Sequence, residues 1–327
     1  WMFAGPAAGE TWGVRTAARR LLTFPCRLVP VNAVPQGAKV RTTSDRSWPP
    51  EPVTVDGVSV SAPNAGIDML ALGETKFIKV GEMAANAHVL QQAEGVGDEQ
   101  KVFLFKIDLS DAYRRWHVHS QDLWKSSKTW RGRSYLDLRA QFGDRSMVES
   151  FQSFTDFYID ILRRLVEGDA AVREACDFDD FDYSVFDNAA SWPELEAWQA
   201  ERAAAGQDTS RADVAGYVDD MFGCALGKKY TAGVLALARK LASAFGFEVK
   251  LEKVAGPSRA LVVLGAWLCL ETGTMRLDGA KLTKYLEAIK VALGPEQRLR
   301  LKDLEGLLGK LVYAAGFTPE GRHMLVA

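Results

Sequence analysis

The chain has 327 residues, of which 47% are hydrophobic and 25% are charged, and its formal net charge is −2. This composition is typical of a soluble globular protein long enough for two or three packed subdomains. No apolar stretch approaches the roughly 20 residues of a membrane-spanning helix, and the four scattered cysteines favour neither a disulfide framework nor a zinc site. We therefore expect an intracellular protein without a membrane segment.

The charged residues are unevenly distributed along the chain. Basic residues dominate the first 46 positions and recur after residue 280, whereas residues 167–213 form an acidic block. Basic flanks permit binding to a phosphate backbone despite the negative net charge. For any single basic residue, a position on a solvated helix face is about as good an explanation as binding to phosphate.

The first half of the chain alternates expected strands and helices. The first 65 residues, rich in Pro and Gly, predict short strands and loops. Residues 80–97 predict a helix, and the apolar run VFLFKIDLS at 102–110 predicts a strand buried on both faces. Two further strands are expected on either side of a turn at Arg131–Gly132.

A long helix and an acidic hairpin follow. Apolar residues at helical spacing predict an amphipathic helix from Met147 to Val166. The acidic block at 167–213 is expected to be an insertion. The stretch AGYVDDMFG at 215–223 then predicts a β-hairpin with Asp219 and Asp220 at its tip, because Asp favours turns over strands.

The last third predicts a helix at 230–247, a second hairpin within 259–278 with its turn at Thr272–Gly273, and helices at 280–292 and 301–315. The order strand, helix, hairpin, helix, hairpin is typical of an α+β fold. We expect an antiparallel sheet with helices on one face.

The simplest interpretation of Asp219 and Asp220 is a solvated acidic turn. A second acidic position, Asp108, ends the buried strand, and the three carboxylates meet if that strand pairs with the hairpin. They would repel each other unless cations lie between them. All-oxygen ligands favour Mg²⁺ or Mn²⁺, and two such ions about 3.5–4 Å apart activate in-line attack at phosphorus.

Several motifs occur in the order found in one enzyme family. YVDD at 217–220 matches a Tyr-x-Asp-Asp box, and IDLSDAYRRWHV has an Asp at a strand end followed by a small-aromatic pair. QFG precedes Phe151 by the spacing of a template motif, Lys253 lies twelve residues before Gly265, and VLGAWL is similar to a primer-gripping hairpin. The chain resembles reverse transcriptases over roughly residues 27–325, apart from the acidic block. KVRTTSDRS resembles their fingers, and KDLEGLLGKLVYAAGFTPEGRHML resembles retrotransposon enzymes of the DIRS, tyrosine-recombinase type.

The resemblance implies a right-hand polymerase with fingers, palm and the start of a helical thumb. An N-terminal extension and fingers would span 1–97, and the first part of the palm, with a fingers hairpin and the template-motif helix, would span 98–166. The acidic insertion would occupy 167–213. The second part of the palm would span 214–277, and thumb or connection helices 278–327.

The resemblance also assigns roles to residues. Asp108 and Asp219 would hold two Mg²⁺ ions, with Mn²⁺ as a substitute and Asp220 assisting, and Lys253 is a candidate proton donor to pyrophosphate. Tyr113 would lie under the sugar and exclude a 2′-hydroxyl. The residues expected to bind the nucleotide are Lys39, Arg41, Leu109, Ser110, Asp111, Ala112, Tyr113, Phe142 and Gly143.

The implied function is an RNA-directed DNA polymerase of a retrotransposon, with an RNA/DNA template-primer and deoxynucleoside triphosphates as partners. Two alternatives remain open: a catalytically silent, co-opted nucleic-acid-binding module, and a two-metal nuclease that needs neither Tyr113 nor Arg41.

Three features depart from the family pattern. Val148 stands where the template motif usually has Pro, and Val34 and Pro35 stand where the fingers usually carry a basic residue. The long acidic insertion could hinder or regulate substrate entry. His117 and His119 alternate along an expected strand but have no third ligand nearby, so we interpret them as structural.

Overall fold

The computed structural model describes most of the chain. The described residues are 31–36, 39–44, 46–47, 50–55, 58–67, 75–110, 112–119, 122, 127–130, 133–141, 143–294 and 300–317. None of the helices formed by these residues is long and apolar enough to cross a membrane. The cysteines among them are free thiols.

A four-stranded antiparallel sheet forms the centre of the molecule, with strand order β10-β5-β9-β8. Its strands are β5 (Val102–Asp108), β8 (Ala212–Tyr217), β9 (Asp220–Leu226) and β10 (Ala255–Ser258). In β5 every residue except Lys106 is buried, which confirms the prediction of a strand covered on both faces.

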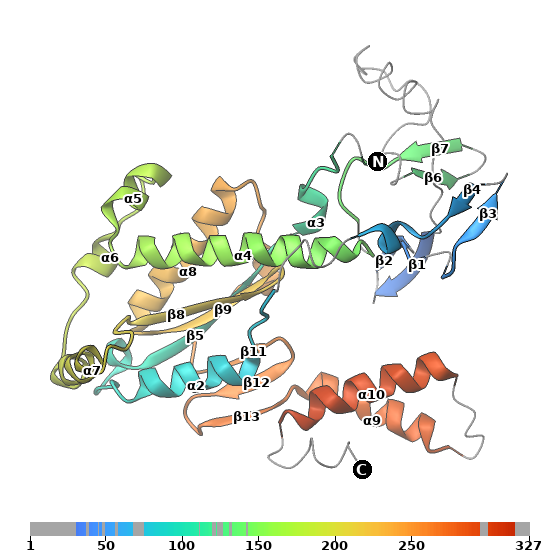
Figure 1. Cartoon of the computed structure of the whole chain (residues 1–327). Coiled ribbons are helices and arrows are strands. Elements are labelled where there is room, and N and C mark those ends of the chain that lie inside the picture. The colour runs from blue at the N-terminus through green and yellow to red at the C-terminus, as the bar shows by residue number, and fades with distance from the viewer. Residues whose placement is uncertain are drawn as a thin grey trace.

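Two helices cover one face of the sheet, α4 (Arg145–Val166) and α8 (Lys228–Ala244) (Figure 1). Alternate side chains of β5, such as Phe105 and Ile107, pack into the core that these helices close. The helices lie where the sequence predicted them, because their apolar residues recur every three or four positions and form one buried stripe.

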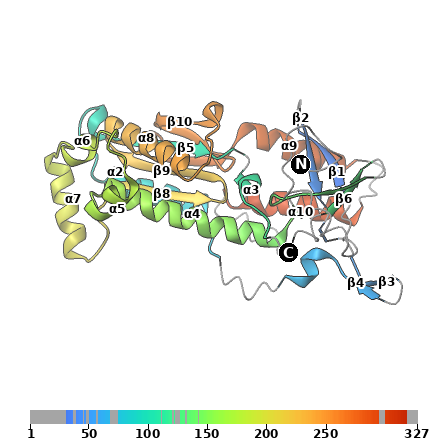
Figure 2. The same cartoon turned by 90° about the horizontal axis from the view of Figure 1, so that it is seen from above.

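The opposite face is covered as well. Helix α2 (Val80–Gln91) packs there against β8 and β9, together with a separate three-stranded sheet. Leu104 and Phe222 point into this second core. The antiparallel sheet and its helices confirm the expected α+β class, and α2 adds a helix to the face opposite α4 and α8 (Figures 1 and 2).

The three-stranded sheet consists of β11 (Ala260–Val263), β12 (Ala266–Cys269) and β13 (Thr274–Leu277). The sequence predicted one hairpin here, with its turn at Thr272–Gly273. The structure has an additional tight turn at Leu264–Gly265, where both residues have positive φ. Because a leucine inside the apolar run VVLGAWL does not indicate a turn, the sequence did not predict the turn at Leu264–Gly265.

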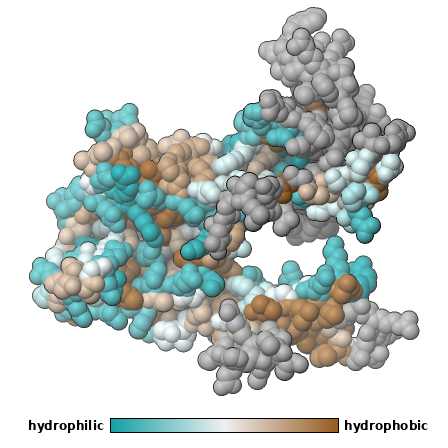
Figure 3. Space-filling view, viewed as in Figure 1, coloured by the Kyte–Doolittle hydropathy of each residue, from teal (hydrophilic) through white to brown (hydrophobic). Residues whose placement is uncertain are grey.

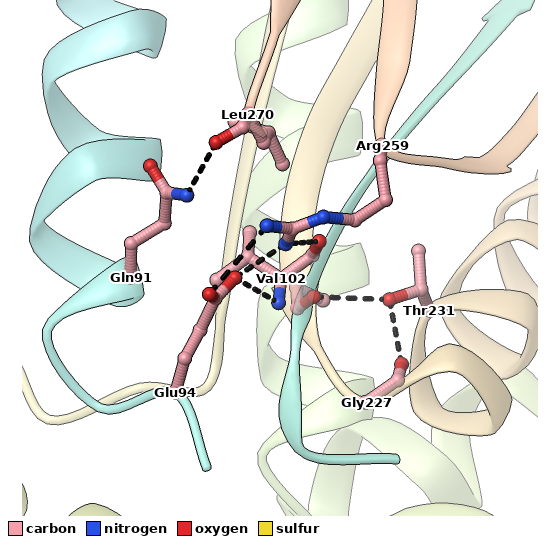
Figure 4. A network of polar contacts seen from close by, with 8 residues as sticks. Gln91, Glu94, Val102, Gly227, Thr231, Arg259 and Leu270 are labelled. Atoms are coloured by element: carbon pink, nitrogen blue, oxygen red, sulfur yellow. Dashed lines mark hydrogen bonds and ion pairs between the residues drawn. The ribbon is translucent and has the colours of Figure 1, made fainter. Parts of the chain in front are cut away.

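A network of polar contacts attaches this sheet to the central one (Figure 4). The Arg259 guanidinium pairs with Glu94 and donates to the Val102 carbonyl at 2.6 Å, and Glu94 also accepts from the Val102 N–H at 2.8 Å. Gln91 at the end of α2 donates to the Leu270 carbonyl at 2.9 Å. Three elements that are distant in the sequence are therefore held at one corner.

The acidic block at 167–213, which the sequence predicts to be an insertion, forms three helices, α5 (Ala170–Cys176), α6 (Ser184–Asp187) and α7 (Pro193–Ala204). Phe186 packs edge-to-face on Tyr230 of α8 at 5.2 Å, and Lys240 of α8 pairs with Asp180. Figure 1 shows these helices at the far end of the central sheet from the short helix α3 (Ala112–Arg115). The insertion therefore does not cover the edge of the sheet where the three carboxylates lie.

Short hairpins lie near the other end of the sheet. They are β1 (Val31–Gln36) with β2 (Lys39–Ser44), β3 (Val53–Val55) with β4 (Val58–Val60), and β6 (Ser127–Trp130) with β7 (Arg133–Leu136). Short 3₁₀ segments occupy Pro63–Gly66, Asp98–Gln100 and Leu251–Lys253. Trp130 pairs with Arg133, as the turn predicted between them requires.

Helices α9 (Gly279–Ala292) and α10 (Leu301–Ala315) follow β13. The pair exposes apolar side chains in a brown patch (Figure 3), and several of these side chains are more than 40% exposed: Leu282, Leu286, Val291, Leu293, Leu301, Leu304, Leu308 and Val312.

Candidate active site

The YVDD stretch forms the tight turn between β8 and β9. Tyr217 pairs with Asp220, so Val218 and Asp219 are the two turn residues, and Asp220 is the first residue of β9. Val218 has a φ of 55°, a left-handed conformation that is strained for a β-branched side chain. The sequence placed both aspartates at the tip, whereas the structure leaves only Asp219 in the turn.

Two buried polar side chains of α4 hold the strained turn. The Gln152 side-chain carbonyl accepts from the Val218 N–H at 2.8 Å, and the Gln152 amide donates to the Gly216 carbonyl at 3.1 Å. The Thr155 hydroxyl donates to the Val218 carbonyl at 2.5 Å. The Thr155 methyl occupies the space that a Cβ at Gly216 would need, so glycine permits this close approach. Both α4 residues were missed from the sequence, because a polar pair inside an amphipathic helix carries no distinctive signal.

The structure brings the three aspartates together. Asp108 and Asp220 are direct partners across β5 and β9, so their side chains lie on the same face of the sheet. The Leu109 N–H donates to the Asp219 carbonyl at 3.1 Å, which fixes the turn against the end of β5. The convergence expected from the sequence therefore results from the strand register.

Two lysines bind Asp108. Lys250 Nζ lies 2.5 Å from Oδ1, and Lys253 Nζ lies 2.6 Å from Oδ2. Lys250 also donates its side chain to the Leu109 carbonyl at 3.0 Å and its N–H to the Asp108 carbonyl at 3.0 Å. Burial alone would raise the pKa of Asp108, but the hydrogen bonds and charges of the two lysines lower it. Lys253 was a candidate site residue, whereas Lys250 was missed because only the fold brings it to Asp108.

Asp219 and Asp220 have the opposite electrostatic environment. Burial raises the pKa of Asp219, and the neighbouring Asp108 charge adds to this effect. For Asp220, burial and then the charges of Asp219 and Asp108 raise the pKa to about 6. The two ammonium groups at Asp108 therefore offset the repulsion among the three carboxylates only in part.

This shift predicts a pH-dependent stability in buffer containing a metal chelator. The pKa of an ordinary Asp, as in the unfolded chain, is 3.8, whereas the pKa of Asp220 in the folded chain is about 6. Between pH 3.8 and about pH 6 the folded chain therefore binds more protons at Asp220 than the unfolded chain does. Stability should then fall as pH rises from about 4 to about 6, by roughly 1–2 kcal/mol because partial solvent access screens the repulsion. Urea unfolding of the wild type and Asp220→Asn at several pH values tests this, and parallel profiles would contradict it. Asp108 changes the stability only at lower pH, because its pKa in the folded chain is below the ordinary value.

The chemistry of these donors fits a hard divalent cation, because three carboxylates with unbalanced negative charge prefer such ions. In this structure, however, the ammonium groups of Lys250 and Lys253 occupy the two oxygens of Asp108. Among the described residues, no group of three or more Asp, Glu, His or Cys side chains is arranged to hold a metal ion. Binding of an ion would require Lys250 and Lys253 to release the Asp108 oxygens. His117 and His119 are exposed, and the strand expected here is wrong: His117 forms only an isolated bridge with Arg139.

A cavity of about 780 Å³ opens beside the carboxylates. The three aspartates, Tyr113, Lys253 and Val148 are among its lining residues. Its size is in the range of pockets that bind small molecules. Val148, one of the departures from the motifs that the sequence otherwise resembles, thus lies in the wall of the candidate site.

The other expected nucleotide-binding residues are placed differently. The N–H groups of Leu109 and Ser110 donate to the Asp219 and Glu248 carbonyls, so neither is available to cradle a phosphate. Ala112 and Tyr113 begin α3, and the Tyr113 ring packs edge-to-face on Phe151 at 5.6 Å. Burial raises the pKa of Tyr113 to about 12, so its hydroxyl stays neutral.

The Gly143 carbonyl accepts from the Asn64 amide at 2.9 Å, away from the cavity lining. Lys39 and Arg41 lie on β2, whose backbone alone is described. Asp111 and Phe142 lie outside the described residues. The structure therefore gathers the aspartates, Tyr113 and Lys253, and leaves the remaining assignments as predictions.

Comparison with known proteins identifies the fold. No protein-family model and no curated protein matches the sequence. A foamy viral protease-reverse transcriptase in complex with double-stranded DNA matches 99% of this chain at 15% identity and a TM-score of 0.53. The foamy viral enzyme in complex with an RNA/DNA hybrid matches 97% at 16% identity and a TM-score of 0.52. The chain spans 45% and 32% of the lengths of these two proteins. The fold is therefore reverse-transcriptase-like, while the relation to DIRS-type elements stays a prediction.

Proposed function

We propose that the chain is an RNA-directed DNA polymerase that adds deoxynucleotides to the 3′ end of a primer. The observation that carries this proposal is the convergence of Asp108, Asp219 and Asp220 beside a cavity, at one edge of the sheet in a reverse-transcriptase fold. Carboxylates on a rigid strand and a braced turn are suited to hold cations in a fixed position. The same observation underlies the assignment as a nucleotidyltransferase.

Asp108 and Asp219, with help from Asp220, would hold two Mg²⁺ ions or, as a substitute, Mn²⁺. The ions would supply charge neutralisation at the transferred phosphoryl group and a more acidic primer hydroxyl. The proximity of three carboxylates and the raised pKa of Asp220 support this part of the proposal.

Residues of the chain would donate a proton, select the sugar and bind phosphate. Lys253, released from Asp108, would donate a proton to the leaving pyrophosphate. Burial lowers the pKa of Lys253, but the hydrogen bond and charge of Asp108 raise it overall, so Lys253 is protonated while it is paired with Asp108. Tyr113, whose ring is fixed by Phe151, would lie under the sugar and exclude ribonucleotides. Arg41 and Lys39 would bind phosphate.

The proposed partners are an RNA/DNA template-primer and deoxynucleoside triphosphates. The two similar foamy viral structures contain double-stranded DNA and an RNA/DNA hybrid. We further propose an intracellular retroelement as the source of the activity.

Primer extension tests the proposal directly. The intact chain should extend a labelled DNA primer on an RNA template when Mg²⁺ and deoxynucleotides are supplied. Absence of incorporation, under conditions in which a known reverse transcriptase works, would overturn the assignment. Cleavage of the duplex without nucleotides would instead indicate a nuclease.

Replacement of Tyr113 by Ala should weaken discrimination against ribonucleotides by about a hundredfold, because the ring no longer blocks the 2′-hydroxyl. The ratio of kcat/KM for matched deoxy- and ribonucleotides measures this effect. Tyr285→Ala, on α9 outside the cavity lining, is the control and should retain the wild-type ratio. An unchanged ratio in Tyr113→Ala would remove Tyr113 from sugar selection.

Replacement of Lys250 by Met should raise the affinity for Mn²⁺ by about threefold to tenfold, since one cation that competes for Asp108 is removed. Titration of free Mn²⁺ by electron paramagnetic resonance measures the affinity without any catalytic assay. Lys229→Met, an exposed lysine on α8, should leave the affinity unchanged. Equal or weaker Mn²⁺ binding by Lys250→Met would contradict competition between lysine and metal.

One observation favours the second candidate, a catalytically silent nucleic-acid-binding module. Both oxygens of Asp108 are bound by lysines, as expected if cations from the protein have replaced the metals permanently. This function predicts that Asp219→Asn leaves duplex binding unchanged and that the wild type incorporates no nucleotide. Measurable extension by the wild type decides against it.

A further inference from the structure

The turn at Leu264–Gly265 forms part of the wall of the carboxylate cavity. Val263 pairs with Ala266, so Leu264 and Gly265 are the two turn residues, with φ of 50° and 84°. Both residues are in the left-handed region, which glycine adopts freely and leucine only at a cost. Something outside the turn must therefore stabilise Leu264 in this conformation.

The Leu264 carbonyl accepts two hydrogen bonds from two different helices. Lys281 Nζ of α9 donates at 2.8 Å, and the Tyr313 hydroxyl of α10 donates at 2.7 Å. A carbonyl oxygen has two lone pairs, so both donors are accommodated. One main-chain atom thus connects the turn to the α9–α10 pair.

Lys281 is fixed in this position by its surroundings. Its ammonium group lies 4.5 Å from the centre of the Tyr313 ring, within the range of a cation–π interaction. Its side chain occupies the space that a Cβ at Gly265 would fill. The ammonium group thus contacts both the Leu264 carbonyl and the Tyr313 ring.

The start of α9 adds a further connection. The Asp278 N–H donates to the Gly265 carbonyl at 3.0 Å, and the Asp278 side chain accepts from the Lys281 N–H at 3.4 Å and so caps the helix. Lys281 and the turn residues line the cavity that also contains Asp219 and Asp220. A shift of either helix would therefore act on the wall that faces the carboxylates.

We propose that Lys281 and Tyr313 are positioning residues that couple the α9–α10 pair to the cavity wall at Leu264–Gly265. Through them the placement of the helices sets the shape of the wall that a bound strand end would contact. The role in substrate placement rests on the proposed polymerase function, whereas the mechanical coupling does not.

Hydrogen–deuterium exchange of the intact chain tests the coupling without an activity assay. In Lys281→Met and in Tyr313→Phe, the segment 260–270 should exchange about fivefold to tenfold faster, since each substitution removes one bond to Leu264. The controls Lys284→Met and Tyr285→Phe alter neighbouring positions of α9 and should exchange like the wild type. Unchanged exchange in both test variants would overturn the coupling. Tyr313→Phe removes a single oxygen atom, so it keeps the test decisive if Lys281→Met does not fold.

Kinetics then test the consequence for substrate. If the wild type extends primers, Tyr313→Phe should raise KM for the template-primer about threefold to tenfold and leave KM for the nucleotide unchanged. A fall in kcat with both KM values unchanged would contradict a role in strand placement. If the wild type extends no primer, the polymerase assignment fails, while the exchange result still decides the coupling.

Discussion

If the proposed metal role is right, Asp219→Asn is expected to lower the rate of nucleotide incorporation by at least about a thousandfold, because the turn then loses a charge proposed to hold cations at the reacting phosphoryl group. Asparagine has nearly the same shape, so the turn and its bonds to α4 should persist. Removal of one of three repelling carboxylates should leave the stability equal or slightly higher, since burial and Asp108 raise the pKa of Asp219. Single-turnover primer extension, combined with urea unfolding, measures both quantities.

Asp179→Asn is the matched control, because Asp179 is exposed in the insertion at the far end of the sheet. It should retain wild-type incorporation. Activity of Asp219→Asn within tenfold of the wild type would show that the turn carboxylate does not take part in the chemistry. The metal-dependent proposal would then be lost, although the fold assignment would stand.

Combined replacement of Gln152 by Leu and Thr155 by Val is expected to produce the second large effect. The N–H and carbonyl of Val218 would then be left buried without partners, at a cost of about 2 kcal/mol each in the free energy of unfolding. Val218 would no longer be held in its strained conformation, and Asp219 would move relative to Asp108. We expect kcat to fall about a hundredfold.

Gln199→Leu provides the control for this experiment. Gln199 donates to the Thr209 carbonyl at 3.1 Å within the insertion, so its loss also removes a side-chain to main-chain bond, but far from the turn. This variant should lose stability and keep its kcat. If the double variant behaves in the same way, bracing of the turn by α4 does not contribute to catalysis.

Much of the fold could be predicted because the signals are local. The continuous apolar run that ends at Asp108 indicates a strand buried on both faces, and the helical spacing of apolar residues over 147–166 indicates the long helix. The acidic pair between two apolar runs likewise predicts a hairpin. The turn at Leu264–Gly265 was missed, because its conformation depends on donors from α9 and α10 and not on turn-forming residues alone.

The candidate site was predicted in part. Asp108, Asp219, Asp220, Tyr113 and Lys253 could be named because they belong to ordered motifs, and the structure places all of them around one cavity. The expected phosphate cradle stays a prediction, and two of its amides already have main-chain acceptors. Those of Leu109 and Ser110 are used by the Asp219 and Glu248 carbonyls, and no local pattern foretells such bonds.

The sequence by itself determined the buried strand, the long helices and the acidic hairpin, since local apolar patterns and turn preferences decide these. Only the tertiary structure decided that Asp108 faces Asp220 and that Lys250, 142 residues further along, neutralises Asp108. The same is true of Gln152, which braces the turn from 66 residues away. The physical reason is that ion pairs and buried hydrogen bonds depend on distances between side chains, and packing sets these distances only after the elements have assembled.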